Sequence, residues 1–197
     1  TVKMYNEEGF VYDVQTQDTI LSVSVAENGS IGVITNGTSY TVTVYSPSGN
    51  MLFQRVEAES GIYPLCCDVS PDGEIIAISY IDTTGVEIKS KIGMFYINSD
   101  VGADYTDSMY GAVEKNDEII FKMYFMGGNN LIAIGDRNIT SISAAGVEEG
   151  SVEVTNEIMG VGLCGNKIAM IYGEELSDKE GELPGTIVFV SSGGKLS

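Results

Sequence analysis

Residues 63–79 read YPLCCDVSPDGEIIAIS, in which the four residues Ser70-Pro71-Asp72-Gly73 separate two apolar runs of strand length. Proline presets the φ angle that opens a turn, and glycine accepts the positive φ angles that tight turns require. Neither run shows the three-to-four-residue periodicity of an amphipathic helix. We therefore predict a β-hairpin, with strands at residues 63–69 and 74–81.

Strand-length runs and turns repeat along the chain in groups of four. The group before this hairpin has predicted strands at residues 20–25, 31–35, 40–45 and 51–56. The hairpin's own group continues with residues 92–97 and a poorly marked strand within residues 105–113. Two further groups have predicted strands at residues 119–125, 131–134, 139–142 and 151–154, and at residues 158–163, 168–172 and 187–190.

The turn after the first strand of each group contains a glycine, at Gly29, Gly73, Gly128 and Gly165, with spacings of 44, 55 and 37 residues. A repeat of about 40 to 50 residues is typical of a β-propeller blade. One twisted four-stranded sheet cannot bury both faces alone, and radial stacking of sheets solves this problem. We predict an all-β fold, a β-propeller with about four consecutive four-stranded antiparallel blades.

The predicted strands do not close simply into a ring of four blades. Residues 1–197 are expected to form one propeller-type domain or fragment, in which two strands precede three full groups and three strands follow. We expect this to be part of a larger ring, and an incomplete ring with exposed sheet edges could form a homo-oligomer. The expected pieces are 1–18 (end of a preceding blade), 19–60, 61–114, 115–156 and 157–197 (an incomplete blade).

Composition excludes several classes of function. The chain has 28 acidic and 10 basic residues, a net charge of −18, and no basic stripe, which argues against nucleic-acid binding. It has no apolar run long enough to insert into a membrane. Histidine is absent, which excludes the usual Ser-His-Asp and Cys-His mechanisms and a Cys/His zinc site. No phosphate-cradling loop occurs either, and we expect no cofactor.

The three cysteines are Cys66, Cys67 and Cys164, an odd count that does not suggest a disulfide framework. Cys66 and Cys67 are adjacent, so in a strand they face opposite sides. We interpret all three as small buried apolar residues. A redox pair or a metal site is the alternative.

Four runs carry a resemblance to known proteins: residues 22–29, residues 42–49, residues 68–73 (Asp-Val-Ser-Pro-Asp-Gly) and residues 90–96. The third resembles the hairpin of WD-like and other bacterial propeller repeats. Over most of the chain, the pattern resembles an uncharacterised family of membrane-anchored, propeller-like proteins of Gram-positive gut anaerobes. The resemblance implies an extracytoplasmic domain, tethered to the membrane through a segment outside this chain, and it supplies no functional residues.

Three sets of residues are candidates for a site. Asp68 lies in a first strand, where it would bind ligand near the central channel or, alternatively, be a buried acid hydrogen-bonded to a neighbouring turn. Tyr105 and Tyr110 would serve recognition, or else fill a strand. The acidic loop holding Asp178, Glu180 and Glu182 would bind calcium, or else be a solvated loop, since it lacks the EF-hand order of ligands.

These observations favour a non-catalytic binding or scaffold propeller that meets protein or glycan at the cell surface. The alternative is a glycosidase- or lyase-like enzyme whose site is completed by absent blades. Two or more acids within about 10 Å at the channel face would favour hydrolysis. An apolar or tyrosine-lined rim would favour binding.

Overall fold

The computed structural model describes residues 1–127, 129–165, 167–173 and 186–191, and antiparallel strands dominate them. Three sheets have four strands each. The first sheet comprises β3 (Thr19–Val25), β4 (Ile31–Asn36), β5 (Tyr40–Tyr45) and β6 (Met51–Glu57). The second sheet comprises β7 (Ile62–Val69), β8 (Ile75–Asp82), β9 (Lys89–Tyr96) and β10 (Met109–Asn116). The third sheet comprises β11 (Ile120–Met126), β12 (Asn130–Gly135), β13 (Asn138–Ile142) and β14 (Glu148–Glu153).

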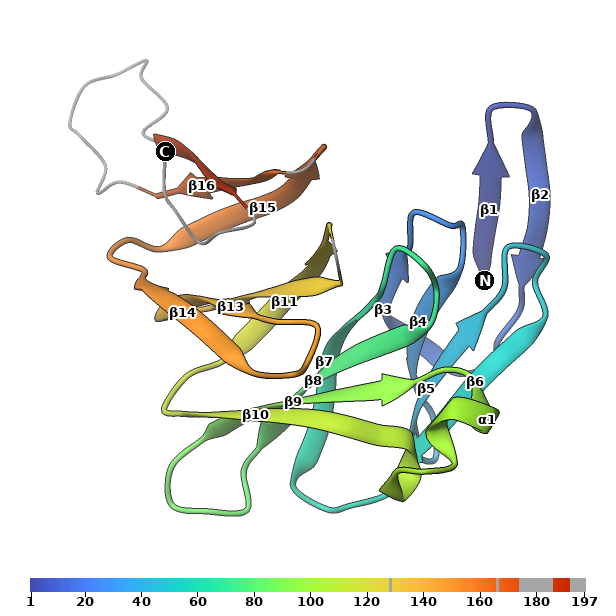
Figure 1. The fold of residues 1–197 in the computed structure, drawn as a ribbon, viewed down its shortest axis with the longest axis horizontal. Helices are drawn as coiled ribbons and strands as arrows, with labels where there is room; N and C mark the ends of the chain where they lie inside the picture. Colours follow the sequence, from blue (N-terminus) through green and yellow to red (C-terminus); the bar gives the residue numbers. More distant parts are fainter. Residues whose placement is uncertain (128, 166, 174–185, 192–197) are drawn as a thin grey trace.

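Two smaller sheets lie at the ends of the chain. The N-terminal hairpin pairs β1 (Val2–Asn6) with β2 (Gly9–Val14). The C-terminal sheet has the order β15 (Ile158–Cys164), β16 (Lys167–Tyr172) and β17 (Thr186–Ser191) among the described residues. Within each sheet, strands that are consecutive in sequence pair with one another, and the sheets follow one another in sequence order (Figure 1). The prediction of an all-β chain built from four-stranded antiparallel sheets is confirmed.

The core lies between the sheets, as separate layers of buried side chains. One cluster joins the N-terminal hairpin to the first sheet, another joins the first to the second sheet, and others join the second to the third and the third to the C-terminal sheet. Strand β8 shows why both faces must be covered. Its Ile76 and Ile78 enter the layer facing the first sheet, while Ile75 and Ala77 enter the layer facing the third.

The adjacent cysteines follow the same alternation along β7. Cys67 packs in the layer toward the first sheet and Cys66 in the layer toward the third sheet. Both are free thiols and are buried, so the interpretation of these two as small apolar core residues is confirmed. Burial raises the pKa of the Cys66 thiol to about 12 and raises that of Cys67 as well, which keeps both protonated and unreactive. The side chain of Cys164 lies outside the described residues.

The turn between β7 and β8 forms as its sequence predicts. The Ser70 backbone carbonyl accepts a hydrogen bond from Gly73 N–H at 2.8 Å, and Gly73 has a φ of 77°. The Ser70 hydroxyl donates to Asp72 Oδ1 at 2.5 Å and accepts from Ile75 N–H at 3.0 Å. A Cβ on Gly73 would lie 2.1 Å from the side-chain amide of Asn28, so glycine is required here both for conformation and for space.

The last strand of the second sheet differs from the prediction. It begins at Met109, inside the predicted range of residues 105–113, but continues beyond that range to Asn116, and a short helix α1 (Ser99–Gly102) and a 3-10 turn η1 (Thr106–Ser108) precede it. Asn98 caps α1 by accepting the Asp100 N–H at 2.9 Å. Helical elements this short leave no periodic pattern in the sequence.

Candidate functional site

The first strands of successive sheets lie next to one another, because β7 contacts β3 on one side and β11 on the other. A pocket of about 760 Å³ opens beside their C-terminal ends. Residues of β3, β7, β11 and β15, and of the turns that follow them, line it. The lining is Val23, Ser24, Val25, Ala26, Glu27, Asp68, Val69, Pro71, Lys122, Tyr124, Phe125, Met126, Gly127, Leu163 and Gly165. We refer to it as the inner pocket.

Asp68 of β7 lies in the inner pocket and links two sheets. Its Oδ2 accepts a hydrogen bond from the backbone N–H of Phe125 on β11 at 2.6 Å. Burial raises the pKa of the Asp68 carboxyl to about 7, although this hydrogen bond and the nearby Lys122 ammonium favour the charged form. The partner is a neighbouring strand, not the neighbouring turn anticipated from the sequence. The role of Asp68 in ligand binding stays a prediction.

Ser24 of β3 lines the same pocket and carries a buried hydroxyl. The residue is 8% exposed, and its hydroxyl has no partner with good hydrogen-bond geometry within the described part of the chain, although it lies near enough to the Cys67 thiol and the Asp68 carboxyl to offset part of the rise that burial causes in their pKa values. A buried hydroxyl without a partner is costly, and an incoming ligand group can satisfy it. In the sequence, Ser24 looks like the other serines of alternating strands. Its burial beside the pocket depends on how the sheets stack, so the sequence alone does not predict it.

The third sheet contributes a cation and an aromatic ring to the inner pocket. Lys122 Nζ of β11 lies 5.2 Å from the ring centroid of Tyr124, two residues along the same strand face. This cation–π contact orients both side chains. Together with Asp68 and Ser24, the pocket therefore combines a carboxyl, a hydroxyl, an ammonium and an aromatic ring on a mainly apolar lining.

The turns at the mouth of the pocket are tied to one another. The side-chain amide of Asn28, after β3, donates to the Asp72 carbonyl at 3.0 Å. The side-chain amide of Asn129, after β11, donates to Asp72 Oδ2 at 2.6 Å. Burial alone would raise the pKa of Asp72, but hydrogen bonds from Ser70 and Asn129 hold it below its usual value. The mouth is thus held by contacts between three sheets.

Tyr105 and Tyr110 lie together, but elsewhere. They form a cluster with Tyr96, in which the Tyr110 ring centroid is 4.6 Å from that of Tyr96 and 6.5 Å from that of Tyr105. Burial, with smaller effects of Tyr96 and Asp72, raises the pKa of Tyr110 to about 12. Neither Tyr105 nor Tyr110 lines the inner pocket, and their role in recognition stays a prediction.

The predicted calcium ligands Asp178, Glu180 and Glu182 lie outside the described residues. Within the described ranges, no three side chains of His, Cys, Asp or Glu come together as a metal site would require. In the same part of the chain, no helix has the length and hydropathy needed to cross a bilayer.

Four-stranded meanders stacked face to face, with their first strands side by side around a pocket, define a β-propeller, and comparison with solved structures confirms this class. The WD40 repeats of RRP9 superpose with a TM-score of 0.62 at 13% identity, over 93% of this chain and 52% of that one. BamB from Moraxella catarrhalis gives 0.56 at 12%, over 98% and 53%. KlAtg21, in a complex with the coiled-coil of AgAtg16, gives 0.54 at 15%, over 86% and 52%.

The chain belongs to a family of unknown function, DUF5711, which it matches over residues 1–193. Comparison with curated proteins gives no match. The chain spans about half the length of the three propellers above, with 52%, 53% and 52% of them covered. At these identities the likeness to solved structures concerns the fold alone.

Proposed function

We propose that this propeller is a non-catalytic binding module that takes a hydroxyl-rich ligand, a glycan, in its inner pocket. The observation that carries the proposal is the meeting of a carboxyl (Asp68), an ammonium (Lys122) and an aromatic ring (Tyr124) in the inner pocket, beside the buried hydroxyl of Ser24. Sugars present donors and acceptors at once, and their apolar faces stack on aromatic rings. The carboxyl of Asp68, the ammonium of Lys122 and the ring of Tyr124 supply the matching partners.

Support for binding rather than hydrolysis comes from the lining of the inner pocket. The lining is mainly apolar, and one of its two acids, Asp68, is 9% exposed and holds a backbone N–H of β11. Glycosidases use two carboxyl groups that flank the scissile bond and are free to act on it. The other acid is Glu27, in the exposed turn after β3.

An enzyme remains the second candidate because of one property of Asp68. A carboxyl with a pKa of about 7 has the value expected of a general acid working near neutral pH. In this alternative, Asp68 protonates a leaving group and a second carboxylate comes from elsewhere in the ring.

The proposal extends to the protein's place and partners. The resemblance to membrane-anchored envelope proteins supports an extracytoplasmic position, with a tether outside this chain. KlAtg21, a propeller of similar fold, is described in complex with a coiled-coil, which supports a protein partner as a further ligand. Protease treatment of intact cells that produce the full gene product tests the position, since only a protein outside the cytoplasm is cleaved.

The ligand is tested by titrating the protein with chitotriose, maltotriose and cellotriose while following backbone amide resonances. Binding of at least one should shift the Phe125 amide, because its N–H reports on Asp68. Ser24→Ala and Tyr124→Ala should each weaken binding at least threefold, whereas Tyr63→Ala, outside the pocket, should not.

No shift with any of the three sugars would contradict a glycan ligand. Release of shorter sugars during the titration would show catalysis instead, and Asp68→Asn should then abolish it.

A further inference from the structure

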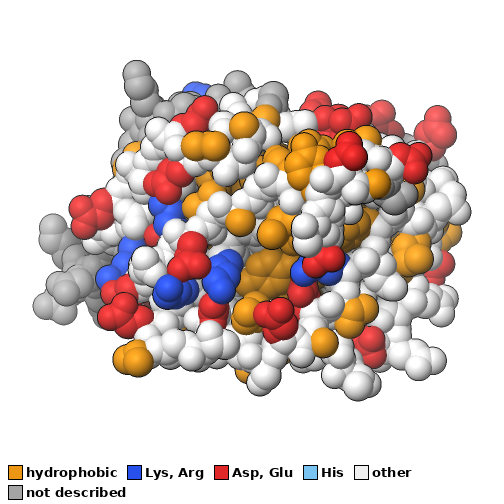
Figure 2. Space-filling view, turned by 60° about the horizontal axis from the view of Figure 1, so that its bottom comes forward, with side chains coloured by type: hydrophobic (Ala, Val, Ile, Leu, Met, Phe, Trp, Pro, Cys, Tyr) orange, Lys and Arg blue, Asp and Glu red, His pale blue; other side chains and the backbone are white. Residues whose placement is uncertain are grey.

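A second pocket, of about 330 Å³, lies between the outer parts of the first and second sheets. Its floor is apolar and comes from the second sheet, with Ile62, Gly93, Phe95, Met109 and Ala112, while the side chains of the neighbouring Ile92 and Val113 pack toward the third sheet. We refer to it as the interblade pocket. Figure 2 shows one face of the protein, on which hydrophobic side chains gather in a hollow bordered by acidic and basic side chains. The inner pocket and the interblade pocket share no lining residue.

The floor of the interblade pocket is built by a glycine and a ring on β9. Gly93 and Phe95 point to the same face of the strand, and a Cβ on Gly93 would lie 2.7 Å from the Phe95 ring. The absence of that Cβ lets the ring lie flat over the strand. Arg55 of β6 stacks on this ring from the first sheet, with Cζ 4.8 Å from its centroid.

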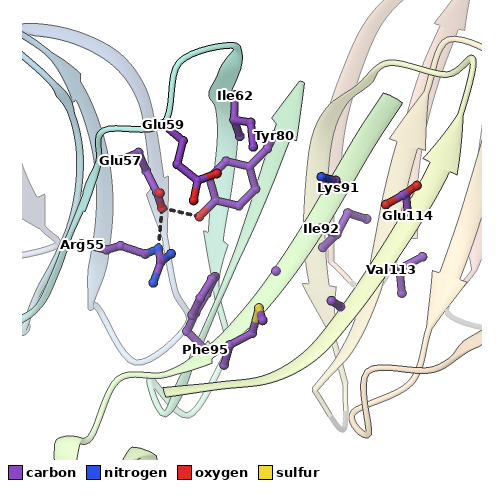
Figure 3. A pocket seen from close by; sticks show the side chains of 13 residues that line it. Arg55, Glu57, Glu59, Ile62, Tyr80, Lys91, Ile92, Phe95, Val113 and Glu114 are labelled. Atoms are coloured by element: carbon purple, nitrogen blue, oxygen red, sulfur yellow. Dashed lines mark hydrogen bonds and ion pairs between the residues drawn. The ribbon is translucent and has the colours of Figure 1, made fainter. Parts of the chain in front are cut away.

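Glu57 of β6 is fully engaged at one wall of the interblade pocket. Its Oε1 accepts hydrogen bonds from Arg55 Nε at 2.5 Å and from the Tyr80 hydroxyl at 2.6 Å (Figure 3). Burial, followed by the interaction with Glu57, raises the pKa of Tyr80, so the hydroxyl remains a donor. These contacts tie β6 to β8 and leave Glu57 with little capacity for a ligand.

Glu59 is the exception among the charged groups of the lining. The lining holds three acidic and two basic side chains, so it carries a net negative charge. Glu59 is exposed, has no side-chain partner among the described residues, and extends beside Tyr80 over the opening (Figure 3). The other charged groups form ion pairs, which are Arg55–Glu57 at 2.5 Å, Lys91–Asp82 at 2.5 Å and Glu114–Lys89 at 2.8 Å.

We propose that the interblade pocket binds an aralkylamine, a single aromatic ring joined by a short chain to one ammonium group. A cavity of about 150 Å³ holds benzene, so about 330 Å³ accommodates a ring with a short side chain. The apolar floor receives the ring, and the carboxylate of Glu59 receives the ammonium. An anionic ligand of the same shape meets the carboxylate of Glu59, which is unpaired within the described structure, and is disfavoured.

The probes are 2-phenylethylamine and two ligands of similar shape, neutral 2-phenylethanol and anionic 3-phenylpropanoate. Each is titrated into the whole chain while the Gly93 amide resonance is followed. The amine should bind with a millimolar Kd, about fivefold tighter than the alcohol, and the acid should bind more weakly than the alcohol. Salt should reduce the amine's advantage and leave the alcohol unchanged, because only the charge interaction is screened. No response to the amine, or equal binding of all three, would overturn the proposal.

Variants separate the contribution of the Glu59 carboxylate to binding from that of the space in the interblade pocket. Glu59→Gln should remove the advantage of the amine over the alcohol without affecting the fold, since the side chain has no partner within the described structure. Glu149→Gln, a matched change of an exposed acid on β14, should have no effect. Glu59→Lys should reverse the order so that 3-phenylpropanoate binds best. Ala112→Trp, level with Gly93 on the neighbouring strand, should block all three ligands, and unchanged amine binding in that variant or in Glu59→Gln would show that the ligand binds elsewhere.

Discussion

Asn129 donates a hydrogen bond from its side-chain amide to Asp72 Oδ2 at 2.6 Å, across 57 residues of sequence. Asn129 has a φ of 60°, a left-handed conformation that asparagine tolerates better than most residues. The same residue therefore shapes its own turn and anchors it to the turn of the preceding sheet. Asp72 also accepts from the Ser70 hydroxyl and the Glu74 N–H, so it joins local and distant structure.

Asp72→Ala should lower the free energy of unfolding by about 2–3 kcal/mol, because several donors lose their acceptor at once. Asn129→Gly keeps the left-handed turn and removes only the link between sheets, so it should lower the free energy by about 1 kcal/mol. Urea denaturation measures both values. Asp104→Ala, at an exposed acid, is the matched control and should change little. Equal effects of Asp72→Ala and Asp104→Ala would contradict the bridging role.

Asp68 should make the protein less stable as the pH rises. Its pKa is about 7 in the folded state and about 4 in an unfolded chain, so the folded state holds the proton more tightly. Between about pH 4 and pH 7 the wild-type protein should therefore lose up to about 4 kcal/mol of unfolding free energy relative to Asp68→Asn. Denaturation of both proteins at pH 4, 5, 6, 7 and 8 gives the difference directly. A difference that does not vary with pH would show that Asp68 is ionised throughout.

Cys66 and Cys67 should resist alkylation in the folded protein. Both thiols are buried and protonated, whereas alkylation requires an accessible thiolate. Iodoacetamide at pH 8, followed by peptide mapping, should leave both unmodified in buffer and modify both in 6 M guanidinium chloride. Rapid modification of either in buffer would place that thiol at the surface.

Tyr80→Phe should lower the free energy of unfolding by about 1–2 kcal/mol, since Glu57 loses one of its two donors in a partly buried position. Tyr63→Phe is the matched control, because Tyr63 is 39% exposed and packs its ring edge-on against Tyr40 without a hydroxyl hydrogen bond in the described structure. The comparison uses denaturant midpoints at constant slope. The same loss in both variants would contradict a specific Tyr80–Glu57 contribution.

Much of the fold follows from local sequence. The turn at Ser70-Pro71-Asp72-Gly73 forms as predicted because its own side chains and glycine specify it. The adjacent pair Cys66 and Cys67 shows the alternation expected of a strand buried on both faces. The segment before β10 escaped prediction, because α1 and η1 depend on one asparagine cap and on left-handed Asp107 and Ser108 rather than on periodicity.

The candidate sites were less predictable than the strands. Asp68 is predictable as a candidate because it is an acid in an apolar first strand, and it lines the inner pocket. Ser24 and Lys122 did not stand out, since their role depends on three strands from different sheets meeting. Glu57 and Tyr80 are 23 residues apart and lie in different sheets. No local sequence pattern predicts their contact, because it depends on how the two sheets stack.

The second sheet shares one layer of side chains with the first sheet and another with the third. In such an array each unit is coupled to its nearest neighbours, and stability is the sum of unit and interface contributions. Among the described residues, the N-terminal hairpin and the C-terminal sheet each share one such layer, so in the isolated chain of residues 1–197 they should open more often than the second sheet. Amide protons of β8 should therefore exchange with solvent most slowly. Local unfolding should begin in the outer sheets and reach the second sheet last.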